Sequence, residues 1–234
     1  TEIYTLSLHD ALPIWAGNTR AARTQYWHVT SIKIKALTYM PSNIWLNGQL
    51  LDRTNLTTSG YCPGNAWWDG TALNFCVGNS TYGNTGELPG VSLHEWGHGM
   101  DEADGKQPAD EGTGETYGDF SGTLQTHDSC VGDGFTGTNC SGYGDACKSC
   151  KGIRDMDYAA HQSGTPHTPL DLDDATGYRC IQYGWPYTGY EGPCRFEGHC
   201  ESYISSEACW DLAARDLPAM GIDTTTAWQI MDRL

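Results

Sequence analysis

The chain has 234 residues and carries 29 acidic side chains against 13 basic ones, which gives a formal net charge of −16. So negative a chain, with so few Lys and Arg residues, argues against nucleic acid or an anionic membrane surface as its partner. Its longest apolar runs are far shorter than a bilayer span, so no membrane segment is predicted. The length suits one sizeable core, which we expect to form one domain with two lobes.

The two ends of the chain do not look native. Residues 1–14, TEIYTLSLHDALPI, resemble over their whole length the in-frame translation of a common short-read sequencing adapter. We therefore expect residues 1–14 to be a non-native segment and residues 15–234 to be the domain, truncated at one or both ends. A native N-terminal strand is the alternative. The last residues begin like a helix after Asp223 and stop without a cap or a breaker.

The first half of the chain predicts one helix and two strands. Residues 24–40 carry apolar side chains at helical spacing, and Pro41 ends the pattern. Residues 43–52 predict a strand, and residues 65–77 predict another, which we expect at the edge of a cleft. Two further helices are predicted over 91–101 and 115–127, followed by a Gly- and Cys-rich loop region over 128–152 and turns over 155–197. The chain then predicts a helix over 201–216 and a final helix after Pro218 and Gly221.

The segment HEWGHGMD, residues 94–101, carries the strongest chemical pattern of the chain. Residues four apart lie on one face of a helix, so His94 and His98 can reach one metal ion. Glu95, the next residue round the helix, would then face water bound to that ion, which is the arrangement of a zinc site with its general base. Because so short a pattern also occurs by chance, the prediction needs a third ligand.

Glu115 is the candidate third ligand. Sixteen residues separate it from His98, and Asp119 follows it at helical i+4 spacing. Two His and one Glu would leave the fourth position of zinc open for water, as in catalytic sites. Asp119 could accept the free ring N–H of a ligand histidine and so fix its tautomer. Two alternatives stay open: Glu111 as the ligand, or Glu115 and Asp119 as solvated acids on a helix surface.

Several segments together resemble the zinc endopeptidases of the thermolysin and fungalysin type, the gluzincins, and the GxGExxxDF form is most similar to fungalysin. The matching segments, in the family's order, are NAWWDGTALNF, HEWGHGMD, GTGETYGDF, KGIRDMDY and GHCESYISSEACWDLAAR. The resemblance covers residues 24–212. It implies an α+β, two-lobed zincin fold with a strand-bearing N-terminal lobe, a mainly helical C-terminal lobe, and zinc in the cleft between them.

The resemblance also implies roles for individual residues. Asn65 and Ala66 match the pair that hydrogen-bonds the backbone of an extended peptide substrate. Arg154 matches an arginine that reaches the substrate carbonyl, and His199 matches the histidine that stabilises the tetrahedral intermediate. Glu95 would act as the general base for water on the zinc.

The sequence departs from the family in two places. Between His98 and Glu115 there is no Tyr, so a tyrosine that some relatives use beside the oxyanion is missing, and whether Tyr117 replaces it is open. The acid that orients His199 is also left open, between Glu197 and Glu191.

Ten cysteines, an even number in an acidic and glycine-rich chain, predict disulfides and an exported protein. Cys62 and Cys76 bracket the expected substrate strand, and a bridge between them would hold its ends. The alternative is a second zinc site or a redox motif at Cys147 and Cys150.

Acidic turns near the zinc motif and later in the chain are candidate Ca²⁺ loops. They lie at residues 101–112 and 171–177 and offer the hard oxygen ligands that calcium prefers. Solvated acidic turns are the alternative.

These patterns lead us to expect a secreted, zinc-dependent endopeptidase that acts on a peptide or protein substrate and has Zn²⁺ as its cofactor. An upstream propeptide would lie outside this chain. Two alternatives remain: a disulfide-stapled, non-catalytic binding domain with structural zinc, and a zincin amidase acting on a non-protein amide.

Overall fold

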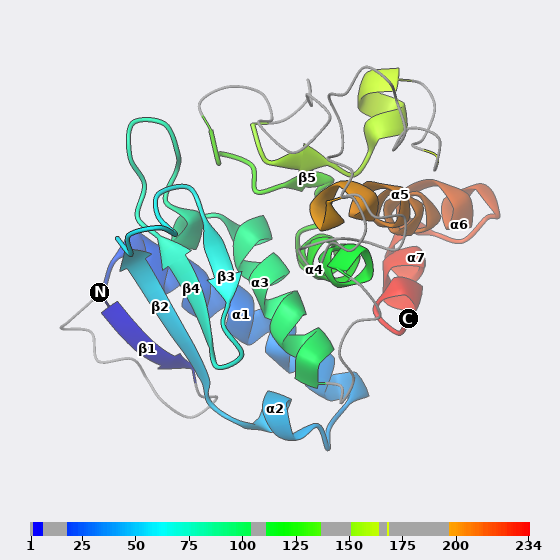
Figure 1. Ribbon diagram of the computed structural model, residues 1–234. Coiled ribbons are helices and arrows are strands. Elements are labelled where there is room, and N and C mark those ends of the chain that lie inside the picture. Colours follow the sequence, from blue (N-terminus) through cyan, green and yellow to red (C-terminus); the bar gives the residue numbers. More distant parts are fainter. Residues whose placement is uncertain (1, 7–17, 104–110, 137–150, 164–167, 169–196) are drawn as a thin grey trace, which may run out of the picture.

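The structure is a computed structural model that describes residues 2–6, 18–103, 111–136, 151–163, 168 and 197–234. Its elements form an α+β architecture with two lobes (Figure 1). A four-stranded sheet, backed by helix α1 (Arg20–Tyr39), makes the N-terminal lobe, and the helices from α4 (Glu111–Thr126) to α7 (Thr224–Met231) make the C-terminal lobe. Helix α3 (Pro89–Ala103) lies between them and contacts both strand β3 (Ala66–Trp68) and helix α4. None of the described helices is long and apolar enough to cross a bilayer.

The sheet has the strand order β1-β2-β4-β3. The strands are β1 (Glu2–Leu6), β2 (Leu50–Leu56), β3 (Ala66–Trp68) and β4 (Ala72–Cys76). β2 pairs parallel with β4, whereas β1 with β2 and β3 with β4 pair antiparallel. β3 is therefore at one edge of this sheet, on the side of the sheet next to α3 (Figure 1).

Helix α1 (Arg20–Tyr39) confirms the helix predicted over residues 24–40 and begins one turn earlier. The Oγ1 of Thr19 caps its start by accepting from the backbone N–H of Ala22 at 3.2 Å. Val29 and Ile32 on its buried face enter the core of the sheet lobe. Pro41 follows its end, as the sequence pattern predicts.

Two strand predictions were wrong in part. Within residues 43–52, a short helix α2 (Ile44–Asn47) precedes β2, because the side chain of Asn43 caps it by accepting from the N–H of Leu46 at 3.0 Å. Within residues 65–77, the chain forms a hairpin rather than one strand. The Asp69 carboxylate accepts from the backbone N–H of Thr71 at 3.0 Å and closes the turn, and Gly70 takes a positive φ of 82°.

The remaining described elements follow the predicted order. They are η1 (Thr85–Glu87), α3 (Pro89–Ala103), α4 (Glu111–Thr126), β5 (Cys130–Val131), β6 (Arg154–Asp155), η2 (Ala159–Ser163), α5 (Gly198–Asp211), η4 (Leu212–Asp216), α6 (Leu217–Ala219) and α7 (Thr224–Met231). β5 and β6 pair antiparallel within the predicted loop regions. Pro218 lies inside α6 rather than breaking the chain, and Gly221, at a φ of 88°, ends this part instead.

Each lobe has its own apolar core. The first core joins the sheet to α1 and α3, and Leu93, Trp96 and Met100 enter it from one face of α3. The second core gathers side chains from β5, α5, η4 and α7, including Trp210 and Trp228. The opposite face of α3 is therefore left to meet α4, at the junction of the two lobes.

Strand β1 lies within the segment that the sequence led us to set aside. Residues 2–6 pair with β2 from Glu2 opposite Thr54 to Leu6 opposite Leu50. The segment EIYTL is rich in residues that favour strands, and the outer edge of β2 offers unpaired backbone groups. The structure thus places these five residues in the sheet, and it does not test the expectation that residues 1–14 are a non-native segment and residues 15–234 the domain. The origin of the segment stays a prediction.

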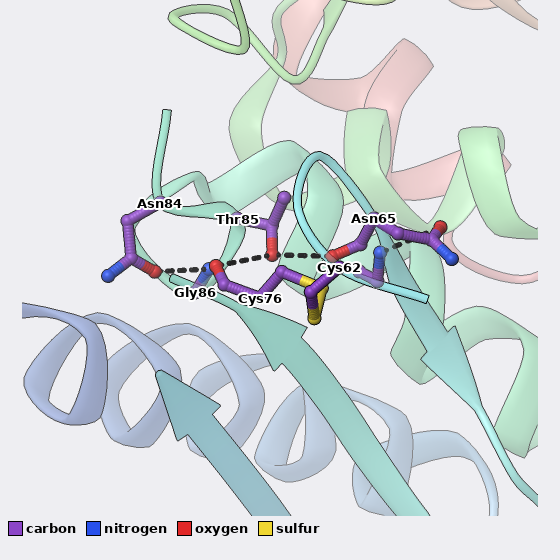
Figure 2. The surroundings of a disulfide bond; sticks show 7 residues. Cys62, Asn65, Cys76, Asn84, Thr85 and Gly86 are labelled. Carbon is purple, nitrogen blue, oxygen red and sulfur yellow. Dashed lines mark hydrogen bonds between the residues drawn. A yellow bond between two sulfur atoms is a disulfide. The ribbon is translucent and has the colours of Figure 1, made fainter. Parts of the chain in front are cut away.

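The predicted bridge between Cys62 and Cys76 is confirmed (Figure 2). It ties the loop before β3 to the end of β4, with the two Cα atoms 5.5 Å apart. Beside it, the Thr85 hydroxyl donates to the backbone carbonyls of Asn65 at 2.9 Å and Cys76 at 3.2 Å (Figure 2). The hairpin is thus held both covalently and by hydrogen bonds.

The other cysteine predictions are tested only in part, and the calcium prediction is not tested. Cys130 and Cys200 are disulfide-bonded as well, whereas Cys209 is a free thiol. Cys147, Cys150 and the acidic turn at 171–177 lie outside the described residues, as does most of the acidic turn at 101–112. The redox, second-zinc and calcium hypotheses therefore stay predictions.

Asp52 is a fully buried carboxyl group on β2. Its side chain and that of Thr54 point the same way as the buried Leu50 and Leu56, and neither has a hydrogen-bond partner among the described residues. Burial raises the pKa of Asp52 well above its usual range, because the charged form is poorly solvated there. The folded protein therefore holds this proton more tightly than the unfolded chain does.

We predict that Asp52→Asn becomes progressively more stabilising, relative to wild type, as the pH rises from 4 to 7. A raised pKa in the folded state costs up to about 1.4 kcal/mol per pH unit above the unfolded value of about 3.9. Urea unfolding at several pH values would show the growing difference. Asp216→Asn removes one charge at an exposed position and controls for net charge. A difference between Asp52→Asn and wild type that stays constant with pH would contradict the prediction.

Candidate active site

One face of helix α3 packs into the first core, and the opposite face lies at the junction of the two lobes. Leu93, Trp96 and Met100 face the first core, whereas His94 and His98, one turn apart, lie on the face toward α4. Their Nε2 atoms are 3.0 Å apart, so both rings point at one place. This follows from the helical spacing of the HExxH segment.

Glycines allow α3 and α4 to approach closely. A Cβ atom on Gly97 of α3 would lie 2.9 Å from the Cα of Gly118 and 2.7 Å from the Ser121 hydroxyl on α4. A Cβ atom on Gly118 would lie 2.7 Å from the ring of His94. Larger side chains at either position would push the helices or the histidine away. The close contact places Glu115 of α4 beside the two histidines.

The side chains of His94, His98 and Glu115 form a compact group of metal-ligating atoms, all within 4.8 Å of one another. Glu115 Oε2 is 3.2 Å from His94 Nε2, and Glu115 Oε1 is 3.4 Å from His98 Nε2. Donors about 2.05 Å from a tetrahedral zinc ion would be roughly 3.3 Å apart. The three donors therefore fit zinc in both type and spacing. Glu111, the rival ligand, is not in this group.

Asp119 and Arg154 form hydrogen bonds with residues of the metal-ligating group. Asp119 Oδ1 is 2.9 Å from His94 Nδ1, where it can accept the ring N–H and leave Nε2 free for a metal. Arg154 Nε donates to Asp119 Oδ2 at 2.7 Å, and its Nη2 is 3.4 Å from Glu115 Oε2. Ser206 of α5 also donates to Asp119, at 3.2 Å. Arg154 is buried with its charge paired, and it lines the cleft as well.

The charges of this cluster fix its protonation in the metal-free protein. Burial alone would lower the pKa of His94, but Glu115 and Asp119 raise it to about 10. Burial would raise the pKa of Asp119, yet Arg154 and His94 hold it at about 2. His199, His98 and His94 likewise hold the pKa of Glu115 well below its usual range despite burial. The carboxylates are thus kept ionised, as metal binding requires.

Glu95 lies on α3 next to His94 and is only 6% exposed. It lines the cleft on both sides of the metal-ligating group. Burial raises the pKa of its carboxyl group, although the nearby His94 and His98 oppose the shift. A carboxyl group with a raised pKa is better matched to accepting and returning a proton near neutral pH than an exposed one.

His199 lies in the first turn of α5 and faces the same group. Its Nε2 is 3.3 Å from Glu115 Oε1, and its Nδ1 contacts Oε1 of Glu197. The other oxygen of Glu197 accepts from the backbone N–H of Cys200 at 3.2 Å and caps α5. Of the two acids considered for orienting His199, Glu197 is therefore the one in contact. Glu191 lies outside the described residues.

A cleft runs between β3 and the metal-ligating group. Asn65 and Ala66 line it together with His94, Glu95 and His199. On one side is a cavity of about 270 Å³ with an apolar wall formed by Tyr82, Val91, Val131, Phe135 and Ile153. On the other side is a cavity of about 620 Å³. Every residue that the sequence assigned to binding or catalysis therefore lies at this cleft, with Asp119 behind it.

Sequence reasoning missed the rest of the cleft wall. Tyr82 and Phe135 come from segments without a motif, and their rings contact each other, with centroids 5.3 Å apart. The position of Glu197, an acid directly before a helix, was a usable signal for a cap. Tyr117 lines neither cavity and is 39% exposed, so it does not take the place of the missing tyrosine in this structure.

Comparison with known proteins supports the fold. No protein-family model and no curated protein sequence matches the chain. Among solved structures, the chain is similar to the precursor of protealysin, a metalloproteinase from Serratia proteamaculans, with a TM-score of 0.51 and 20% sequence identity. The match covers 87% of this chain but only 65% of that one, so the chain spans less than two thirds of its length.

At this identity the likeness establishes the fold alone. The α+β zincin fold that the sequence motifs implied is thereby confirmed. The narrower resemblance to fungalysin finds no support, because the matching structure is a metalloproteinase of another name.

We predict that Gly118→Ala weakens zinc binding about 10- to 100-fold, the range seen when support around a metal ligand is lost. Its new Cβ would lie 2.7 Å from the His94 ring and displace it. Gly122→Ala is the matched control on the same helix, because its Cβ would lie 3.3 Å from the nearest atom, the carbonyl of Gly90. Both variants gain the same helix propensity. Competition with a zinc chelator measures the affinities, and equal affinities for the two variants would refute the prediction.

Zinc binding should release a proton and strengthen with pH. In the metal-free protein, a His94 pKa of about 10 keeps the ring protonated between pH 6 and 8. Zinc needs the neutral ring, so one released proton should tighten the apparent Kd by about tenfold per pH unit. Calorimetry in two buffers of different ionisation enthalpy counts the protons. An apparent Kd that does not change between pH 6 and 8 would contradict this.

Proposed function

We propose that this chain is the catalytic part of a secreted zinc-dependent endopeptidase. The observation that supports it is the spacing of the three donors of His94, His98 and Glu115, with Glu95 buried beside them at a cleft bordered by an edge strand. Three protein ligands with a carboxylate base next to them is the arrangement of catalytic zinc sites rather than structural ones. The zincin fold of the chain agrees with this proposal.

His94, His98 and Glu115 would hold the zinc, and Glu95 would move the proton. A zinc ion held by these residues would act as a Lewis acid, which polarises a substrate carbonyl and lowers the pKa of a bound water toward about 7. Glu95 accepts a proton from the attacking water and then delivers it to the leaving amine. Its burial and raised pKa suit both steps, because the carboxyl group must take up the proton and return it at similar pH.

His199 and Arg154 would act on the substrate carbonyl. His199 is oriented by Glu197, so its Nε2 faces the cleft beside Glu115. As a donor there, it would stabilise the negative charge that develops on the carbonyl oxygen. Arg154 lines the smaller cavity while it binds Asp119, so it would both hold the ligand group in place and contribute positive charge.

A peptide is the substrate that best fits the cleft. β3 is an edge strand of the described sheet, and Asn65 and Ala66 at its start line both cavities. An extended peptide can add to such an edge through backbone hydrogen bonds, which align the bond to be cleaved. A non-protein amide would use the zinc group but would have no use for the strand edge.

Export is proposed from the cysteines. The Cys62–Cys76 bridge and the disulfide-bonded Cys130 and Cys200 suit an oxidising compartment. The Serratia metalloproteinase to which the fold is similar is a precursor. We propose that this chain, too, belongs to a protein made with a propeptide.

A non-catalytic binding domain with structural zinc is the competing function. Structural zinc sites have four protein ligands, whereas three such donors converge among the described residues. A structural site would also have no use for the buried Glu95. The two functions predict different results for the same set of variants.

Glu95→Gln should bind about one zinc per chain and lose 10²- to 10⁴-fold in activity on an unfolded polypeptide such as casein, because the amide cannot accept the proton. Glu115→Ala should bind zinc more weakly, since it removes a ligand. His199→Ala should keep its zinc and reduce kcat, because its interaction forms mainly in the transition state. Zinc analysis and peptide cleavage measure both quantities. Fully zinc-loaded wild type that cleaves nothing, or Glu95→Gln as active as wild type, would show that the mechanism is wrong.

A further inference from the structure

The cleft extends past the metal-ligating group into the larger cavity, of about 620 Å³. This cavity and the smaller one, of about 270 Å³, share His94, Glu95, Asn65, Ala66 and His199. If the proposed function holds, a peptide lying along β3 would place side chains from opposite sides of the cleaved bond in the two cavities. The linings of the cavities then determine which side chains are accepted.

The two linings differ in chemistry. The smaller cavity has an apolar wall and one paired cation, Arg154. The larger cavity is aromatic and acidic away from the metal-ligating group, where it is lined by Tyr61, Trp67, Trp68, Asp69, Asp101 and Glu102. Its described lining contains no Lys or Arg. A cationic side chain is the chemistry that such a wall favours.

Glu102 is the acid that is best placed to meet a ligand. Trp68 Nε1 donates to its Oε2 at 2.5 Å and fixes the carboxylate, while Oε1 accepts no hydrogen bond from a described residue. Glu102 stands in the last turn of α3, which contains no basic residue. The negative end of the helix dipole makes this a poor place for an anion. A bound cation would relieve that unfavourable arrangement.

Asp69 contrasts with Glu102 because its charge is already compensated. Arg53 Nη1 pairs with Asp69 Oδ2 at 2.7 Å, and Thr71 and Asn74 also donate to this carboxylate. Asp69 therefore stabilises the turn of the hairpin. Glu102 supplies a negative charge to the larger cavity, and no described residue forms an ion pair with it.

The aromatic side chains add a second attraction for a cation. The rings of Tyr61 and Trp67 pack with centroids 4.8 Å apart, and Tyr61 is 55% exposed. Ring faces beside a carboxylate bind ammonium and guanidinium groups by cation–π attraction. The net charge of −16 would also draw cationic peptides toward the molecule.

We propose that the larger cavity selects a lysine or arginine side chain of the substrate, and that Glu102 is the main specificity-determining residue. The selected side chain lies on the opposite side of the cleaved bond from the one that fills the apolar cavity. Shape alone does not require this preference, because a 620 Å³ cavity would also admit a neutral chain of the same length.

Matched quenched-fluorescence peptides test the proposal. They share one sequence and differ by Lys, Arg, Gln, norleucine or Glu at one position at a time, within three residues of the cleaved bond. We expect kcat/KM for Lys and Arg to exceed that for Gln and norleucine by roughly tenfold at one position, on one side only. The ratio should fall with added salt, because the cavity is open to solvent.

Variants assign the preference to Glu102. Glu102→Gln should bring the Lys to Gln ratio close to one, because the amide still accepts from Trp68 but has no charge. Glu102→Lys should reverse the preference toward the Glu peptide. Asp216→Asn, which removes one charge and lines neither cavity, should keep the wild-type ratio. The Kd values of the Lys and Gln peptides for Glu95→Gln protein give the same comparison without turnover.

The outcomes separate this inference from the proposed function. Wild type that cleaves none of the peptides would overturn the proposed function. Wild type that cleaves Lys, Gln and norleucine peptides equally well, or a Lys preference that survives in Glu102→Gln, would overturn the inference alone. Zinc content and unfolding midpoints of each variant show that a changed ratio comes from a folded protein.

Discussion

The close contact between α3 and α4 is the constraint on which the candidate site depends. The histidines and Glu115 come from different helices, and their donor atoms converge only because Gly97 and Gly118 leave the helices so near to each other. The outer faces of the same helices are anchored in different cores, α3 in the core of the sheet lobe and α4 against the core of the helical lobe. The metal-ligating group therefore lies where the two lobes join.

The buried carboxylates beside this helix contact are balanced by neighbouring cationic side chains. Glu115 and Asp119 are almost fully buried, which is costly for carboxylates without partners. Arg154 and the histidines balance them, so the cluster keeps its acids ionised despite their burial. Glu95, at the edge of the same cluster, has a raised pKa instead. Glu95 and Glu115 face the same three histidines, but Glu115 also has a hydrogen bond with His94, whereas the charge of Glu115 adds to burial in raising the pKa of Glu95.

The sequence predicted the parts of the molecule that depend on local spacing. The helices around HExxH and Glu115, and the cap at Asp223, follow from patterns within one or two turns. The sequence-based prediction was wrong where a hydrogen bond from the backbone to a polar side chain decided the local structure. Asn43 caps α2 in a segment predicted as a strand, and Asp69 closes the turn of a hairpin in a segment predicted as one strand. Contacts between distant segments, such as the Tyr82 and Phe135 rings, have no local signal at all. Part of the apolar wall of the smaller cavity is of this last kind.

Glu197 connects the folding of a helix to the geometry of a reactive group. One of its oxygens caps α5 and the other contacts His199, so one side chain serves two purposes through two atoms. An aspartate is one methylene shorter, and a glutamine presents only one acceptor oxygen, so neither reproduces both contacts. A substitution of Glu197 therefore changes both the N-terminal cap of α5 and the orientation of the His199 ring, whether it arises by natural variation or by protein engineering.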